Sequence, residues 1–149
     1  MNLFKEILEA EKQLQLVVQK TPLLENLNLS EEYNATILLK REDLQVVRSY
    51  KIRGAYNKIS SLTEAERTQG IVCASAGNHA QGVAYSCNLL QIKGVIYMPK
   101  TTPKQKIKQV QQFGKKYVEI ILTGDTFDDA FSTAIAACEK DKSIFILCL

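Results

Sequence analysis

The sequence predicts an α/β fold in which a mainly parallel sheet lies between two layers of helices, a three-layer sandwich. Short unbroken apolar runs, which are typical of strands buried on both faces, alternate with stretches whose apolar residues recur at helical spacing. That alternation indicates βαβ units with right-handed crossovers. A length of 149 residues suffices for one domain with a sizeable core, and two full domains are not expected.

The first fifty residues have the least regular pattern. Asn2 is a predicted cap for an opening helix, whose apolar face would comprise Leu3, Phe4, Ile7 and Leu8. The Thr21-Pro22 pair then ends any helix, because proline disfavours helical geometry in the residue before it. A strand is predicted over residues 35–39, directly before the charged run at residues 40–43.

From residue 50 onward the alternation is regular. A helix is predicted over residues 50–59, and residues 63–66 have the spacing of a capping box. The predicted strands cover residues 71–75, 94–98, 118–122 and 144–147. The helices between them are predicted over residues 80–90, over residues 103–113 with Gly114 as an end signal, and over residues 127–138.

Composition narrows the class of protein. The chain is 46% hydrophobic, which argues against disorder, yet its apolar runs are far shorter than the roughly 18 residues that a membrane span needs. The opening residues lack the charge and apolar pattern of a signal peptide. We therefore expect a cytoplasmic protein with no membrane partner. A net charge of +3 is too small to indicate nucleic acid by itself.

No metal site is expected. The cysteines at positions 73, 87, 138 and 148 are scattered without a C-x-x-C pair, and His79 is the single histidine. Free thiols in a reducing compartment are the simplest interpretation.

The segment Ser75-Ala76-Gly77-Asn78-His79-Ala80-Gln81-Gly82 is the first candidate for chemistry. It follows a predicted strand and opens a helix, so it lies where ligands collect in α/β sheets. Gly77 permits close backbone approach, and free N–H groups at a helix start favour an anion such as a carboxylate or phosphate. An ordinary strand-to-helix turn, capped by serine or asparagine, is the alternative interpretation.

The second candidate is Arg48-Ser49-Tyr50-Lys51-Ile52-Arg53-Gly54-Ala55. Lys51 beside Arg53 at a helix start is poorly placed for the helix dipole, and such crowding favours the neutral amine that attacks carbonyl groups. A solvated lysine on an amphipathic helix is the alternative.

A third feature is a set of six lysines between residues 100 and 116, for which a solvated helix face is the favoured interpretation. Nucleic-acid binding is the less favoured alternative, because glutamine and threonine rather than stacking aromatics lie between the lysines. The phosphate-loop, G-x-G-x-x-G and G-x-S-x-G motifs do not occur in the sequence.

Considered together, five segments resemble the threonine dehydratases (threonine ammonia-lyases), which depend on pyridoxal phosphate. They are residues 39–45, 49–55, 75–82, 98–104 and 124–130. The resemblance extends from about residue 21 to residue 146. Cysteine and threonine synthases match less well, because an acidic residue usually occupies the position of Ile52.

The resemblance implies a role for each site residue. Lys51 would form the internal aldimine with pyridoxal 5'-phosphate and then act as acid and base at the substrate α-carbon, while Asn78 would hydrogen-bond the phenolic oxygen of the cofactor. Ser75, Gly77 and His79 would hold the substrate carboxylate. The implied reaction converts L-threonine to 2-oxobutanoate and ammonia, the entry to isoleucine biosynthesis, with the cofactor as electron sink.

The resemblance also implies an incomplete type II pyridoxal-phosphate enzyme fold. Residues 1–47 would form the N-terminal edge of a large cofactor domain and residues 48–149 a small mobile α/β domain, with the remainder of the large domain absent. Family members carry a downstream glycine-rich phosphate loop, whereas the last glycine here is Gly124.

Three alternatives therefore stay open: a truncated, catalytically silent remnant or binding module that pairs with a separately encoded remainder, a serine dehydratase or racemase, and a generic anion- or nucleic-acid-binding domain. Homo-oligomer formation also stays open.

Overall fold

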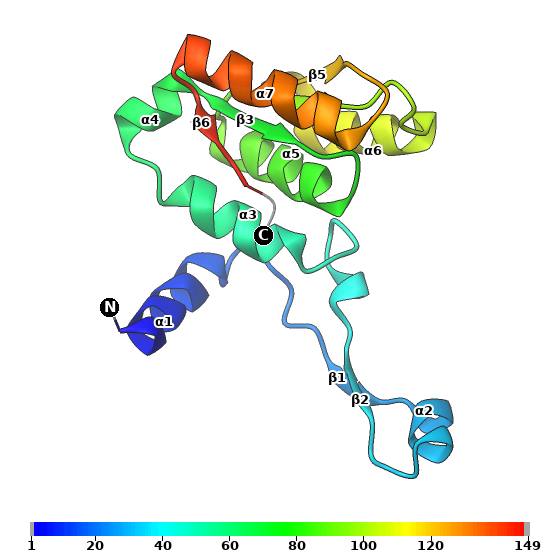
Figure 1. Cartoon of the computed structure of the whole chain (residues 1–149). Coiled ribbons are helices and arrows are strands. Elements are labelled where there is room, and N and C mark those ends of the chain that lie inside the picture. Colours follow the sequence, from blue (N-terminus) through cyan, green and yellow to red (C-terminus); the bar gives the residue numbers. More distant parts are fainter. Residues whose placement is uncertain (1, 148–149) are drawn as a thin grey trace.

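The computed structural model describes residues 2–147 and shows a four-stranded sheet between helical layers (Figure 1). The strand order is β5-β4-β3-β6, and every neighbouring pair is parallel. The strands are β3 (Ile71–Ala74), β4 (Gly94–Met98), β5 (Val118–Leu122) and β6 (Ile144–Phe145). The predicted parallel sheet is confirmed, although β6 is two residues shorter than the predicted strand over residues 144–147.

Alternate residues of β3 face opposite helical layers. Ile71 and Cys73 belong to a core cluster formed with α3 (Lys51–Ser60), α5 (Asn78–Leu90) and α6 (Lys104–Gly114). Val72 and Ala74 belong to a second cluster with Ala130 and Ala134 of α7 (Phe127–Asp141). The single helix α7 thus covers one sheet face, and α3, α5 and α6 lie on the other (Figure 1). The predicted three-layer sandwich is confirmed.

Local capping explains where two helices begin. The predicted capping box opens α4 (Glu64–Gln69): the Glu66 carboxylate accepts from the Thr63 backbone N–H, and the Thr63 hydroxyl accepts from the Glu66 N–H. A second capping box, formed by Thr126 and Asp129, opens α7.

Gly114 is the last residue of α6, and close packing against β5 is the reason that it must be glycine. A Cβ at Gly114 would lie 2.4 Å from the Val118 Cβ. The positive φ that glycine often takes at a helix end falls instead on Lys115, at 50°. The 3-10 turn η2 (Lys115–Tyr117) then leads into β5.

Residues 2–47 form an extension beside this sandwich. The predicted opening helix is confirmed as α1 (Leu3–Leu14), and the Asn2 side chain accepts from the Lys5 N–H. An antiparallel pair, β1 (Leu23–Glu25) with β2 (Leu38–Lys40), then projects away from the sheet with α2 (Leu27–Glu32) at its tip (Figure 1). The 3-10 turn η1 (Glu42–Leu44) connects this pair back toward α3.

The predicted strand over residues 35–39 is shifted, because its pairing with β1 begins only at Leu38, opposite Glu25. None of the helices formed by residues 2–147 is both long and apolar enough to cross a lipid bilayer. Within the same range, no three His, Cys, Asp or Glu side chains are grouped to bind a metal ion.

Candidate functional site

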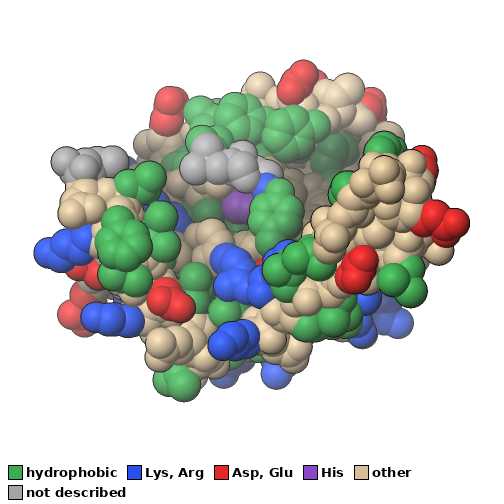
Figure 2. Space-filling view, turned by 90° about the horizontal axis from the view of Figure 1, so that it is seen from below, with side chains coloured by type: hydrophobic (Ala, Val, Ile, Leu, Met, Phe, Trp, Pro, Cys, Tyr) green, Lys and Arg blue, Asp and Glu red, His purple; other side chains and the backbone are tan. Residues whose placement is uncertain are grey.

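A cavity of about 460 Å³ joins the two segments that the sequence singled out. Its walls come from the first turns of α3, the start of α5 and the residues that follow β6. Lys51 and His79 both line it, and a view from below shows the histidine side chain within a hollow flanked by basic side chains (Figure 2). The full lining is Tyr50, Lys51, Arg53, Gly54, Ala55, Asn57, Lys58, His79, Phe145, Ile146 and Leu147.

Lys51 is held at this cavity by a close crossing of α3 and α5. Gly82 of α5 lies against the Lys51 backbone, where a Cβ would be 3.1 Å from both the carbonyl carbon and the carbonyl oxygen. Glycine is needed here for close approach, because a larger residue would push the two helices apart. The Lys51 ammonium lies 5.2 Å from the centre of the Tyr50 ring, within the range of a cation–π contact.

The loop between β3 and α5 is organised by Ser75. Its hydroxyl oxygen accepts hydrogen bonds from the N–H groups of Gly77, at 3.2 Å, and Ala80, at 3.3 Å. Ser75 therefore shapes the start of α5. A Cβ built on Gly77 would meet no other described residue within 4 Å. A ligand therefore has room to approach the backbone N–H groups that begin the helix.

His79 is buried, and its ring supports the end of β6. Its Nε2 lies 3.2 Å from the Ile146 carbonyl oxygen, so Nε2–H is the donor and Nδ1 is left as an acceptor. Burial, and secondly the charge of Lys51, lower the pKa of His79 from its ordinary value, although the Ile146 carbonyl opposes this. The lowered pKa favours the neutral form of the ring.

The predicted site residues are brought together only in part. Lys51 and His79 share the cavity, whereas Ser75, Gly77 and Asn78 do not line it. Asn78 is exposed at the first position of α5, one residue before His79.

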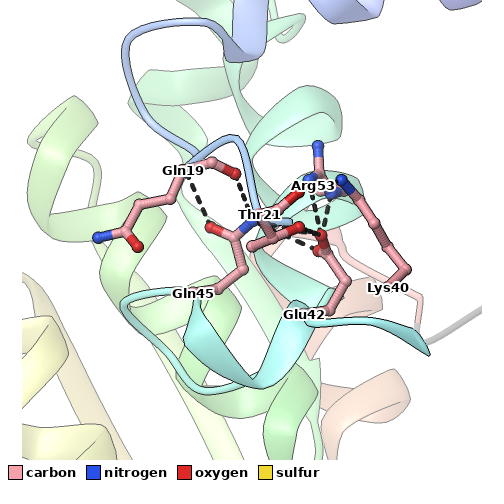
Figure 3. Close-up of polar contacts among 6 residues, drawn as sticks. All are labelled: Gln19, Thr21, Lys40, Glu42, Gln45 and Arg53. Carbon is pink, nitrogen blue, oxygen red and sulfur yellow. Dashed lines mark hydrogen bonds and ion pairs between the residues drawn. The ribbon is translucent and has the colours of Figure 1, made fainter. Parts of the chain in front are cut away.

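A network of polar side chains around Arg53, two residues after Lys51 in the chain, was not predicted from the sequence (Figure 3). The guanidinium of Arg53 donates from Nε to Glu42 Oε2 and from Nη2 to Glu42 Oε1, both at 2.8 Å. Hydrogen bonding to Arg53, more than to Thr21, lowers the pKa of Glu42 to about 2, against the opposing effect of burial. The charged run at residues 40–43 is the sequence feature that could have suggested this pair.

A second cavity, of about 710 Å³, lies between α1 and the Glu42–Arg53 pair. Its walls combine apolar residues of α1, among them Ile7 and Leu14, with the basic side chains of Lys20, Lys40 and Arg53. Arg53 therefore lines both cavities.

Comparison with known proteins decides the family. The profile of the family described as "Pyridoxal-phosphate dependent enzyme" matches residues 14–147. The chain belongs to this family. Family membership confirms the cofactor predicted from the sequence, and the cavity-lining amine of Lys51 with the open space beside Gly77 fits that group.

Two curated relatives carry the description "L-threonine dehydratase biosynthetic IlvA". The relative from Halalkalibacterium halodurans is 59% identical over 142 residues, covering 95% of this chain and 34% of its own length. The relative from Bacillus subtilis is 56% identical over the same share of each chain. The predicted resemblance to threonine dehydratases is confirmed, and the chain spans about a third of the length of these relatives.

Solved structures confirm the type II pyridoxal-phosphate enzyme fold. The processed form of threonine deaminase isoform 2 from Solanum lycopersicum superposes with a TM-score of 0.88 at 39% identity, over 97% of this chain and 39% of that one. Maize serine racemase gives a TM-score of 0.87 at 26% identity, over 96% and 43% of the two chains.

Proposed function

We propose that this chain supplies the lysine-bearing part of a cytoplasmic pyridoxal-phosphate enzyme that deaminates L-threonine to 2-oxobutanoate and ammonia in isoleucine biosynthesis. The observation that carries this proposal is that Lys51 and His79, from the two segments that resemble threonine dehydratases, line one cavity. The relatives described as biosynthetic threonine dehydratases support the choice of substrate.

In this proposal the Lys51 amine would hold the cofactor at its aldehyde group and would carry the proton at the substrate α-carbon. Asn78 holds the phenolic oxygen of the cofactor by its side-chain amide. Bound pyridoxal phosphate supplies the electron sink that makes the α-proton removable.

The carboxylate of the amino acid is assigned to the loop at Ser75, Gly77 and His79. The Ser75 hydroxyl accepts from the N–H groups of Gly77 and Ala80 and keeps its own O–H as a donor. That O–H, together with the remaining backbone N–H groups at the start of α5, would donate to the carboxylate. Binding at that point would orient the substrate relative to Lys51 before any bond breaks.

The division of the chain follows the same proposal. Residues 1–47 are assigned to the edge of the large cofactor domain and residues 48–149 to the small domain. The many exposed apolar side chains before residue 48 support this division, since such a surface is typical of an unfinished interface. Homo-oligomer formation stays a prediction.

A catalytically silent binding module is the second candidate. The chain spans about a third of the length of the curated relatives, and ammonia release by the chain decides between the two candidates. A serine dehydratase or racemase is a narrower alternative, supported by the likeness to maize serine racemase.

Reductive labelling tests the assignment of Lys51. The purified chain is incubated with pyridoxal phosphate, reduced with borohydride, digested, and analysed by mass spectrometry. We expect labelling of Lys51 well above that of Lys58, which is exposed on the same helix and lines the same cavity. Labelling of Lys51 no greater than that of the other lysines would contradict the proposal, and Lys51→Arg is the control for peptide assignment.

Ammonia release separates the two candidates. The chain with added cofactor is supplied with L-threonine or L-serine, and ammonia is measured with the Lys51→Arg variant as blank. Release by the chain alone would exclude the silent module, and the ratio of the two rates would distinguish a threonine from a serine enzyme.

A further inference from the structure

We propose that Glu42 is a positioning residue for Lys51: its carboxylate, acting through Arg53, fixes the first turn of α3 and so holds Lys51 at the cavity. This inference rests on the proposed role of Lys51 and names the residues that hold Lys51 in place for that role. Glu42 itself lines neither cavity.

The start of α3 needs an anchor from outside the helix. Its N-cap residue, Tyr50, makes no side-chain capping bond, and its first turn contains no acidic residue. Lys51 and Arg53 instead place two positive charges at the end of the helix dipole that favours negative charge. A carboxylate brought from elsewhere in the chain supplies the negative charge that this end of the helix lacks.

Glu42 brings that carboxylate from η1 in a geometry that also sets direction. The two parallel hydrogen bonds from Arg53 fix the angle of the guanidinium as well as its distance. The Glu42 side chain is only 16% exposed and that of Arg53 35%, so water competes weakly for this pair. Because Arg53 lies two residues after Lys51, fixing it limits how the first turn of α3 can move.

The carboxylate is held in turn by two neighbouring segments. The Thr21 hydroxyl donates to Glu42 Oε1 at 2.6 Å. Gln45, only 1% exposed, is tied to residue 19, because its Nε2 donates to the Gln19 carbonyl at 2.9 Å and its Oε1 accepts from the Gln19 N–H at 3.0 Å. Lys40 donates to the Thr21 carbonyl. These hydrogen bonds join residues 19–21 to residues 40–45 and so fix the position of the Glu42 carboxylate (Figure 3).

The neighbouring residue Asp43 provides a matched control. It is also a carboxylate of η1, but it is 56% exposed and pairs with Arg41, two residues away in the chain. Removing its charge changes the net charge of the protein as much as removing that of Glu42, and leaves the contact with α3 intact.

The test measures how fast borohydride traps pyridoxal phosphate on Lys51 over a range of cofactor concentrations. It compares the wild-type chain with the variants Glu42→Gln, Arg53→Lys and Asp43→Asn. A misplaced amine reacts slowly even when the cofactor is bound, so we expect the saturated rate at Lys51 to fall roughly tenfold or more in Glu42→Gln and Arg53→Lys. The half-saturating concentration and the labelling of Lys58 should change less than about twofold, and Asp43→Asn should match the wild type. Circular dichroism shows whether each variant is folded.

Arg53→Lys keeps the charge and loses the paired geometry, so it tests positioning even where Glu42→Gln is poorly folded. The double variant should lose no more than the more affected single variant, because both remove the same contact. An unchanged saturated rate in folded Glu42→Gln, an equal loss at all lysines, or an equal loss in Asp43→Asn would overturn the inference.

A cofactor-free measurement separates this inference from the proposed function. If wild-type Lys51 shows no preference for pyridoxal phosphate, the proposed function fails, and the positioning of Lys51 is then read from acetylation by an active ester. We expect the ratio of Lys51 to Lys58 acetylation to change by about threefold or more in Glu42→Gln and to stay constant in Asp43→Asn. A constant ratio in both variants would overturn the positioning role.

Discussion

Residues 48–147 and residues 2–47 are stabilised by different means. The first of these regions has two core clusters, one on each face of the sheet, which include side chains with no exposed surface such as Ile96 and Val83. In residues 2–47 the buried side chains are only Leu14, Thr21, Gln45 and Val47. Large apolar side chains are instead exposed there: Leu3, Phe4, Ile7, Leu8, Leu16, Leu23, Leu24, Leu27, Tyr33, Leu38, Leu39, Leu44 and Val46.

The difference shows where each region obtains its order. The sandwich is stabilised by apolar burial, which is non-directional and distributed over many residues. The extension is attached through α1 and through the polar network around Glu42, in which a few directional bonds determine the geometry. Lys51 lies at the junction, on a helix that belongs to the sandwich and is anchored by the extension.

The largest expected difference in stability is between truncations of apolar side chains in the two regions. Ile96→Ala removes a fully buried side chain from the centre of β4, and we expect it to lower the free energy of unfolding by about 2–5 kcal/mol. Leu24→Ala, at a residue 46% exposed, should lower it by less than about 0.5 kcal/mol. Urea unfolding followed by circular dichroism measures both, and equal losses would contradict the contrast.

Two glycines test how closely α3 and α5 must pack. Gly82→Ala would place a Cβ 3.1 Å from the Lys51 carbonyl group, and we expect a loss of about 1–3 kcal/mol in unfolding free energy. Gly54→Ala on α3 meets nothing within 4 Å and should stabilise the chain by about 0.5–1 kcal/mol through helix propensity. Thermal melting compares them, and a stable Gly82→Ala protein would show that the crossing is loose.

Acid should weaken the attachment of the extension through Glu42. Its pKa falls from 4.5 to about 2 on folding, mainly because Arg53 donates to the carboxylate, so its contribution is complete above pH 4.5. That contribution, about 1–2 kcal/mol after allowance for partial exposure, should be lost as the pH falls from 4.5 toward 2. Urea titrations at several pH values should show a flatter profile for Glu42→Gln than for Asp43→Asn.

The smallest expected effect concerns His79. Because burial lowers its pKa below 6.5 in the folded chain, its neutral form contributes stability that is complete above pH 6.5 and is lost as the pH falls from 6.5 through the lower pKa of the folded chain. We expect a loss of less than about 1 kcal/mol between pH 7 and pH 5 that is missing in His79→Gln. An identical pH profile for both proteins would show that the ring is not buried in solution.

The regular part of the fold was predictable because the spacing of apolar residues along the sequence indicates which side chains are buried. Each strand from residue 71 onward was placed correctly apart from its ends, since apolar runs and helical spacing persist over several turns. The elements β1 and α2 were missed, because β1 has only three residues, all exposed, and α2 only six, which is too few to show a period. Their order comes from pairing with β2 and from the Asn26 side chain, which accepts from the Leu29 N–H.

The candidate site was predictable in its residues more than in its geometry. The two segments around Lys51 and His79 were identified from residue types, and the structure places both at one cavity. The use of the Ser75 hydroxyl in the turn agrees with the alternative interpretation of this loop as a serine-capped turn. The contact of the His79 ring was missed, because it depends on which backbone group lies opposite.

The sequence by itself determined the alternation of strands and helices and indicated Lys51 as the proposed reactive amine, because both depend on local residue order. The tertiary structure alone decided that Gly82 meets the backbone of Lys51 and that Glu42, rather than the adjacent Asp43, pairs with Arg53. Packing brings together residues that are distant in the chain, and which of two neighbouring carboxylates faces a helix depends on the path of the backbone between them.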